Sequence, residues 1–291
     1  MINWPSSLIK DIARRNCVLY LGSGVSHNSQ NANGEHPMTW VEFLNNSTNN
    51  TDLSNKQKKE ISNKIKVSDY LMACELYRRY VGREAFNEIV KDAYQKPKYK
   101  EADIHQQIFK LDSRIVVTPN FDRIYDTYAS SESKSTIVTK HYYDTDIANF
   151  IRDSDRIILK IHGCISKPDR MIFSQVDYAK ARNKYSGFYQ ILNALIITQT
   201  FVFLGAGLND PDIRLLLENY SFQYEWSRKH FFVIPNKQLT DTERKIYEES
   251  LNISFILYDS SNNHKELTDS LRDLVEKVEI SRLEIAESQD W

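Results

Sequence analysis

The chain of 291 residues is long enough for one large domain or for one core with a subdomain, and its 41% hydrophobic and 26% charged residues are typical of a soluble globular protein. The formal net charge of -1 gives no general attraction to polyanions, so we expect no direct nucleic-acid binding. Residues 1–16 lack the charged-then-apolar order of a signal peptide, and no apolar stretch has the length of a membrane span. We therefore expect a cytoplasmic protein that makes no membrane contact.

Short apolar runs rich in β-branched residues alternate with amphipathic segments, as in a series of βαβ crossovers. Each run is apolar on both faces, which a parallel sheet covered by helices requires. The sequence therefore predicts an α/β fold with a parallel sheet flanked by helices. The expected strands lie at 17–21, 114–118, 156–161, 201–205, 230–234 and 253–258.

The first predicted strand leads into residues 20–27, YLGSGVSH. Gly22 and Gly24 would allow the backbone to turn sharply and approach a diphosphate, which the amides of a following helix would face. The third glycine of a G-x-G-x-x-G motif is absent, because position 27 is His. A tight turn without a ligand explains this segment equally well.

About ninety residues separate the first two predicted strands, and they show helical periodicity with no strand signal. Because a parallel crossover needs only about a dozen residues, we expect an inserted helical subdomain at about 36–100. At the other end of the chain, residues 264–287 predict one charged amphipathic helix. This helix either closes the sheet or makes a subunit contact.

The three cysteines, Cys17, Cys74 and Cys164, are too few and too scattered for a four-ligand zinc site. We expect buried thiols and no zinc or other metal. Cys164 is close in sequence to His162, which leaves a reactive role open for this thiol.

Polar residues follow three further predicted strands. Asn120 and Asp122 in TPNFD would reach a bound ribose, or would form a turn with an Asp-capped helix. His162 in KIHG is either a core histidine or a base. In GAGLNDPDI, Asp210 and Pro211 are expected to begin a helix. Because the carboxyl ends of parallel strands meet at one edge, these segments together predict one site.

These four segments, GSGVS, TPNFD, KIHG and GAGLNDPDI, in this order and at these separations, resemble the sirtuin-like NAD-binding family and particularly its bacterial antiviral-defence branch. The resemblance covers about 15–260. It implies a Rossmann-like sheet with a small module, a single catalytic domain over residues 1–291, and NAD as the ligand. Asn120 and His162 would be the catalytic residues. The NAD-binding residues implied by the resemblance are Gly22, Ser23, Gly24, Ser26, Asp122, Gly205, Gly207 and Asn209.

Protein-deacylating sirtuins have a four-cysteine zinc ribbon, and this chain lacks those cysteines. We therefore expect an NAD hydrolase that releases nicotinamide and ADP-ribose, acting as an antiphage effector that depletes cellular NAD in abortive infection. Two alternatives remain open. One is a protein deacylase or ADP-ribosyltransferase whose groove is supplied by the insert, and the other is a catalytically silent NAD or ADP-ribose sensor that acts through assembly.

An enzyme that drains NAD has to be held inactive until it is needed. We expect regulation by a homo-oligomer and by a separate activating protein. The resemblance implies a HerA-type hexameric ATPase or an Argonaute-like subunit as that partner.

Overall fold

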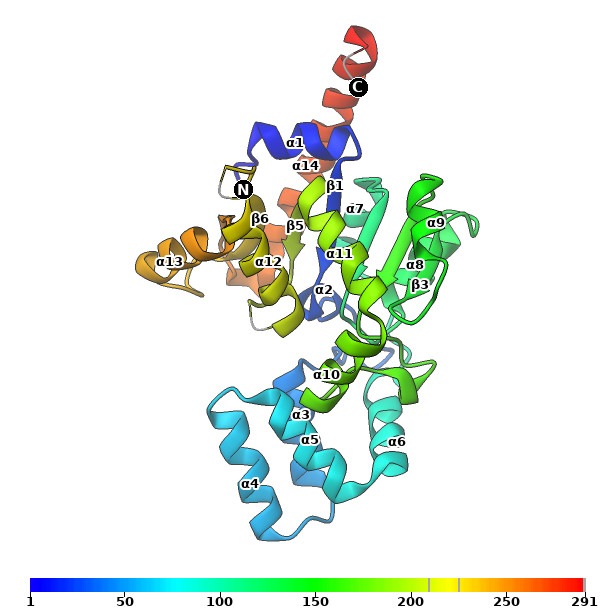
Figure 1. Cartoon of the computed structure of the whole chain (residues 1–291), viewed down its shortest axis with the longest axis vertical. Coiled ribbons are helices and arrows are strands. Elements are labelled where there is room, and N and C mark those ends of the chain that lie inside the picture. Colours follow the sequence, from blue (N-terminus) through cyan, green and yellow to red (C-terminus); the bar gives the residue numbers. More distant parts are fainter. Residues whose placement is uncertain (209, 225, 290–291) are drawn as a thin grey trace.

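A seven-stranded parallel sheet forms the centre of the computed structural model, in the order β3-β4-β2-β1-β5-β6-β7 (Figure 1). The structure describes residues 1–208, 210–224 and 226–289. The predicted α/β fold with a Rossmann-like parallel sheet is confirmed, and the six predicted strands are correct to within one residue at each end. The strands are β1 (Cys17–Leu21), β2 (Ile115–Thr118), β3 (Val138–His141), β4 (Ile157–Lys160), β5 (Thr200–Leu204), β6 (His230–Pro235) and β7 (Ile253–Tyr258). The prediction missed β3, because this edge strand is short and only half-buried and therefore shows no apolar run.

Helices cover both faces of the sheet, and a separate group of helices lies beyond the carboxyl ends of its strands (Figure 1). Across the part of the chain that the structure describes, none of them has both the length and the apolar character needed to cross a membrane. The helices are α1 (Ser6–Ala13), α2 (Ser23–Ser26), α3 (Trp40–Asn50), α4 (Asn55–Lys66), α5 (Tyr70–Val81), α6 (Arg83–Tyr94), α7 (Asp103–Lys110), α8 (Ile124–Glu132), α9 (Ile147–Arg152), the 3-10 helix η1 (Pro168–Arg170), α10 (Gln175–Lys184), α11 (Ser186–Thr198), α12 (Pro211–Gln223), α13 (Asp241–Leu251) and α14 (Ser261–Ser288).

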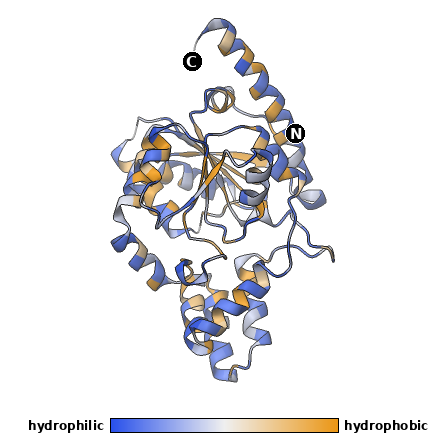
Figure 2. Ribbon diagram, turned by 90° about the vertical axis from the view of Figure 1, so that its right-hand side faces the viewer, coloured by the Kyte–Doolittle hydropathy of each residue, from blue (hydrophilic) through white to orange (hydrophobic). Residues whose placement is uncertain are grey.

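Alternate residues of the strands enter two different cores, because successive side chains of a strand point to opposite faces. On β1, Val18 and Tyr20 join the core that contains residues of α10, α11 and α12. Leu19 and Leu21 join the core that contains residues of α1, α7 and α14. Figure 2 shows the apolar strands enclosed between the two helical layers. Burial on both faces explains why these strands read as continuous apolar runs.

The predicted helical insert is confirmed as the four helices α3 to α6, which follow β1 and pack around a core of their own (Figure 1). Capping boxes begin two of them, Thr39 with Glu42 at α3 and Ser54 with Gln57 at α4. Gly82, with a φ of 84°, separates α5 from α6. Cys164, Ile165, Met171 and Phe173 from the segment after β4 belong to the same core, so this segment joins the insert to the sheet.

The predicted C-terminal helix closes one face of the sheet. Leu267, Leu271 and Leu274 of α14 are buried in the second core, against α1 and α7. The positive φ values of Asn262 to His264 interrupt the first turn, so the regular helix begins close to the predicted boundary. Ile280 and Leu283 of the same helix remain 58% and 66% exposed. A subunit contact through this exposed side of α14 stays a prediction.

The turns after β1 and β5 touch through their backbones. The Gly22 amide donates to the Leu204 carbonyl and the Gly24 amide to the Gly205 carbonyl, both at 2.9 Å. A Cβ atom on Gly22 would lie 2.3 Å from the Gly205 oxygen. The chain leaves β1 toward β2 and leaves β5 toward β6 on the opposite side, so this contact marks the point where the direction of the sheet reverses.

We expect the change Gly22→Ala to force the two turns apart and to lower the free energy of unfolding by about 1–3 kcal/mol, as overpacking does. Gly187→Ala is the matched control, because a Cβ atom there meets nothing within 4 Å and the residue lies in α11. That control should be neutral or stabilising by up to about 1 kcal/mol. Urea unfolding followed by circular dichroism measures both variants, and equal stabilities would contradict the proposed contact.

Candidate active site

A cavity of about 230 Å³ lies between the carboxyl edge of the sheet and the helical insert. It sits at the point where the sheet direction reverses, which is where open α/β sheets bind their ligands. All four predicted strand ends contribute to it. The residues from the sheet side are Tyr20, Gly22, Ser23, Ser26, Pro119, Asn120, Phe121, Asp122, His162, Ala206, Gly207 and Asp210. The remaining residues are Pro37, Met38, Trp40, Tyr70, Tyr94, Ile172, Phe173 and Tyr178.

Two of the predicted NAD-binding glycines do not line this cavity among the described residues. Gly24 and Gly205 instead contact each other, since a Cβ atom on Gly24 would lie 2.9 Å from the Gly205 Cα atom. The amide hydrogen atoms of Gly22 and Gly24 are already bound by carbonyl groups of the protein. A direct contact of these amides with a diphosphate stays a prediction, and Asn209 lies outside the described residues.

A hydrogen-bond chain joins the turns after β1 and β2. Asn120 Nδ2 donates to the Gly22 carbonyl at 2.9 Å and to Ser26 Oγ at 3.0 Å. Ser26 Oγ donates in turn to Asp122 Oδ2 at 2.8 Å. Both amide hydrogen atoms of Asn120 are therefore used, and within the described residues no donor binds its Oδ1. This oxygen is left to accept a hydrogen bond from a ligand or a water molecule.

The carboxylate of Asp122 is a structural group in this arrangement. Its Oδ1 accepts the amide hydrogen of Ile124, the first residue of α8, at 3.0 Å, and only 7% of the residue is exposed. The ammonium of Lys160, itself buried, donates to the Asp122 carbonyl and lies 3.6 Å from Asp126 Oδ1. The sequence left open a ribose-binding role and a capping role for Asp122. The structure places Asp122 next to Arg123, the N-cap residue of α8, and the ribose-binding role stays a prediction.

His162 lies beyond the end of β4, 4% exposed, with its ring edge-on to Tyr178. Its Nε2 lies 3.6 Å from Asp210 Oδ2 and 3.7 Å from Asp212 Oδ2, and no described residue makes a hydrogen bond to it. Burial lowers the pKa of His162, but the two carboxylates outweigh burial and raise the pKa above the usual 6.5. The imidazole can therefore take up a proton in a place where burial alone would prevent it.

Asp212 is held firmly at the first turn of α12. Arg182 Nε and the Tyr189 hydroxyl donate to its two oxygens at 2.6 Å and 2.9 Å, and the residue is 2% exposed. Burial raises the pKa of Asp212, but contacts with His162 and Arg182 outweigh it, so that the pKa falls below 3.8. The carboxylate is thus charged at neutral pH and faces the imidazole.

Asp210 combines the two roles that the sequence indicated for its segment. It caps α12 by accepting the amide hydrogen atoms of Asp212 and Ile213, and Pro211 is in the first turn, as predicted. It also faces His162 and accepts a hydrogen bond from the Tyr20 hydroxyl at 3.2 Å. The segment NDPDI carried the signal for this function, since two carboxylates two residues apart begin a helix at the end of a strand.

The aromatic wall of the cavity was not predicted. Phe121 and Phe173 stack with their ring centres 4.5 Å apart, and Trp40 of α3 meets Phe173 edge-on at 6.2 Å. Trp40 and Phe173 are far apart in sequence, and no local pattern distinguishes these rings from ordinary core residues.

The three cysteines are buried and free, as expected. Burial raises the pKa of the Cys17 and Cys74 thiols. Burial also acts to raise the pKa of Cys164, but hydrogen bonding from His141 and the charge of Lys160 outweigh it, so that this pKa is lowered. None of the three lines the cavity, and the described residues contain no cluster of metal-ligating side chains. The absence of zinc stays a prediction.

The fold and the site define an α/β protein whose ligand cavity lies at the reversal point of a parallel sheet, the position used for nucleotides. Residues 114–256 match the family model of the SIR2-like domain. This part of the chain is therefore similar to a SIR2-like domain, and the predicted resemblance to the sirtuin-like family is confirmed.

Three relatives illustrate the similarity. Defense-associated sirtuin 2 of Bacillus subtilis is 29% identical over 192 residues, which cover 65% of this chain and 19% of the relative. NAD(+) hydrolase ThsA of Enterococcus faecium is 24% identical over 261 residues, covering 88% of this chain and 49% of the relative. NAD(+) hydrolase ThsA of Bacillus cereus (strain MSX-D12) is 22% identical over 278 residues, covering 90% of this chain and 54% of the relative. The matched region thus spans about a fifth to about half of the length of these relatives.

We expect the change Asp212→Asn to lower the pKa of His162, because it removes a buried negative charge that favours the imidazolium. NMR measures the pKa by following the ring signal of His162 as the pH is changed. This signal is assigned as the one that is missing from the spectrum of His162→Ala. Glu218→Gln is the matched control, since Glu218 lies on the same helix but pairs with Arg214 at the surface. A pKa of His162 that is unchanged in Asp212→Asn would contradict the electrostatic role of Asp212.

Proposed function

We propose that this chain hydrolyses NAD to nicotinamide and ADP-ribose. The observation that supports this proposal is that Asn120, with a free oxygen, and His162, with a free ring nitrogen, line one cavity of a SIR2-like domain. Two of the relatives described above are named NAD(+) hydrolases, and the alignment with each covers most of this chain.

Asn120 and His162 can meet the main chemical requirements of NAD hydrolysis. Nicotinamide leaves NAD as a neutral molecule from a pyridinium, so its departure needs no general acid. It does need stabilisation of the positive charge that develops on the ribose. Asn120 Oδ1 is placed to orient a ribose hydroxyl or the attacking water. Neutral His162 is placed to accept the proton that this water releases.

The two carboxylates beside the free Nε2 of His162 favour the protonated form that such a transfer produces. Asp210 and Asp212 lie 3.6 Å and 3.7 Å from this nitrogen. The same charges reduce the fraction of neutral His162 at low pH. We therefore expect the rate of NAD hydrolysis to increase as the pH rises through the raised pKa of His162, because the neutral form is the base.

The size of the cavity limits how NAD enters. Its volume of about 230 Å³ lies below the roughly 300 Å³ at which complete ligand sites usually begin. This space suits one half of the dinucleotide, so the other half must extend beyond it or the insert must move. We propose that the segment 205–209, which contains the predicted ligand residues Gly207 and Asn209, contacts the adenosine half of NAD.

We expect Asn120→Ala and His162→Ala each to reduce nicotinamide release by about 100-fold or more, because each removes a group that orients or accepts in the transition state. Chromatography of the products after incubation with NAD measures this. Asn63→Ala, an exposed change on α4, is the matched control and should keep full activity.

Adding an acetylated peptide to the same assay distinguishes the alternatives. Turnover that requires the peptide would indicate deacylation, and NAD binding without turnover in any variant would indicate a sensor. Full turnover in both site variants would contradict the catalytic assignment.

We further propose that the protein is an antiphage effector that depletes cellular NAD in abortive infection. The similarity to a protein named defense-associated sirtuin supports this role. Such an enzyme needs control, and we propose a homo-oligomer together with a separate activating protein, of the HerA-type ATPase or Argonaute-like class. The exposed Ile280 and Leu283 on α14 and the small cavity support regulation through assembly.

We expect light scattering to give a mass above that of one chain and Ile280→Ser with Leu283→Ser to reduce it, since both changes remove exposed apolar surface. Val67→Ser is the matched control, because Val67 is 70% exposed but follows α4 in the insert. A fluorescent NAD-analogue assay should show little activity for the chain alone and more with its partner. A fully active monomer would contradict both the proposed homo-oligomer and the proposed need for an activating partner.

A further inference from the structure

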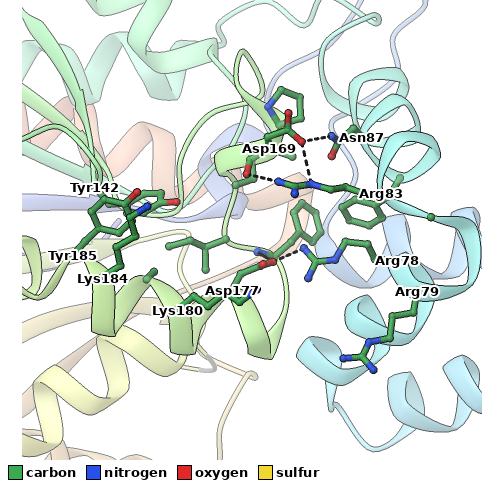
Figure 3. Close-up of a pocket in the computed structure, with 17 residues that line it drawn as sticks. Arg78, Arg79, Arg83, Asn87, Tyr142, Asp169, Asp177, Lys180, Lys184 and Tyr185 are labelled. Carbon is green, nitrogen blue, oxygen red and sulfur yellow. Dashed lines mark hydrogen bonds and ion pairs between the residues drawn. The ribbon is translucent and has the colours of Figure 1, made fainter.

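A second, larger cavity of about 490 Å³ lies where the insert meets α10 and the segment before it (Figure 3). It shares only Ile172 and Phe173 with the candidate active site. The remaining residues that line it are Arg78, Arg79, Gly82, Arg83, Phe86, Asn87, Tyr142, Pro168, Asp169, Met171, Asp177, Lys180, Ala181, Lys184 and Tyr185.

The walls of this cavity are mostly basic. Five cationic side chains line it, against two carboxylates. Both carboxylates are engaged, since Asp177 Oδ2 binds Arg78 at 2.7 Å and Asp169 Oδ1 binds Arg83 at 3.1 Å. Glu75, which lies outside the lining, also pairs with Arg78 at 3.0 Å and with Arg79 at 2.7 Å. The charge left over for an anion is therefore mainly that of the two lysines.

Two of the cations have no carboxylate partner in the described parts of the chain. Lys180 and Lys184 are exposed, lie one turn apart on α10, and make no ion pair with any described residue. Figure 3 shows them across the cavity from the three arginines. Arg79, 68% exposed, is bound only at Nε, by Glu75. A ligand therefore has cationic groups available on both sides.

The inner surface of the cavity is apolar and aromatic. Phe86 and Phe173 meet edge-on with their centres 5.2 Å apart, and Tyr142 meets Tyr185 in the same way at 5.0 Å. Met171 and Ile172 fill the space between, and both are buried. Aromatic rings beside unpaired cations are the chemistry that accommodates a planar base carrying phosphates. A volume of about 490 Å³ is within the range of nucleotide-sized ligand sites.

We propose that this cavity is a second binding site, separate from the NAD cavity, for a nucleoside polyphosphate. The phosphates bind Lys180, Lys184 and Arg79 at the rim, and the base lies against the aromatic interior. The concave shape favours a compact ligand over an extended acidic peptide, which would need a groove open at both ends.

The shared wall gives this site a route to the catalytic cavity. The Ile172 amide donates to the carbonyl of His162 at 2.9 Å, and Phe173 stacks on Phe121, the neighbour of Asn120. Asp177, which holds Arg78, also accepts the amide hydrogen of Phe173 at 3.2 Å. Arg79 is the neighbour of Arg78, and Lys180 lies on the same helix as Asp177. A phosphate held between Arg79 and Lys180 therefore acts on the Arg78–Asp177 pair and, through it, on the segment between the two cavities.

The test is calorimetric binding of ATP, without divalent metal, to the full chain and to the double variant Lys180→Glu with Lys184→Glu. We expect binding to wild type that weakens with added salt and falls by about tenfold or more in the variant. Lys56→Glu with Lys59→Glu is the matched control, since these exposed lysines on α4 give the same change of charge. The control should bind ATP as wild type does.

Wild-type chain that shows no binding at about 1 mM ATP, or equal binding by both double variants, would overturn the site. This readout needs no catalytic activity, so it is independent of the proposed function. The link to catalysis does rest on that function. ATP should change the KM for NAD by threefold or more in wild type but not in Lys180→Glu with Lys184→Glu. If ATP instead competed with NAD in the NAD cavity, the change in KM would persist in that variant.

Discussion

The backbone contact between the turns after β1 and β5 is the constraint on which the candidate site depends. Because Gly22, Gly24 and Gly205 have no side chains there, the two turns approach until their amides and carbonyls bind at 2.9 Å. The approach brings Asp210, which follows β5, toward the polar groups that follow β1, β2 and β4. Those groups are Ser26, Asn120 and His162. A side chain at the contact would separate the two halves of the cavity by the width of a methyl group or more.

The two walls of the cavity come from different parts of the chain and supply different properties. The sheet turns supply the polar groups, which are fixed by helix caps and by hydrogen bonds to the backbone. The insert and the segment after β4 supply rings that exclude water. Exclusion of water strengthens the interaction of His162 with its two carboxylates, so the electrostatics of the sheet side depends on the packing of the insert.

The sequence was sufficient to predict most of the sheet, because strands buried on both faces appear as uninterrupted apolar runs. It was also sufficient to place Ser26, Asn120 and His162 at one edge, since each directly follows a strand or its turn. It failed at β3, whose residues are half-buried, and it gave no sign that Gly24 contacts Gly205. The pairing of His162 with Asp212 and the edge-on contact of Trp40 with Phe173 depend on contacts between distant segments. Such contacts leave no local pattern in one sequence.

The way α14 closes the sheet bears on how the protein is made. The residues discussed as catalytic all precede position 213, but the core on the α14 side is covered only when Leu267, Leu271 and Leu274 are in place. During synthesis, the nascent chain therefore carries the proposed catalytic side chains on a sheet with one uncovered apolar face. Since domains fold as units as they leave the ribosome, this one acquires its site only after α14 has emerged. Ribosome-bound chains are thus kept from forming the finished cavity, and their open face is a natural target for chaperones.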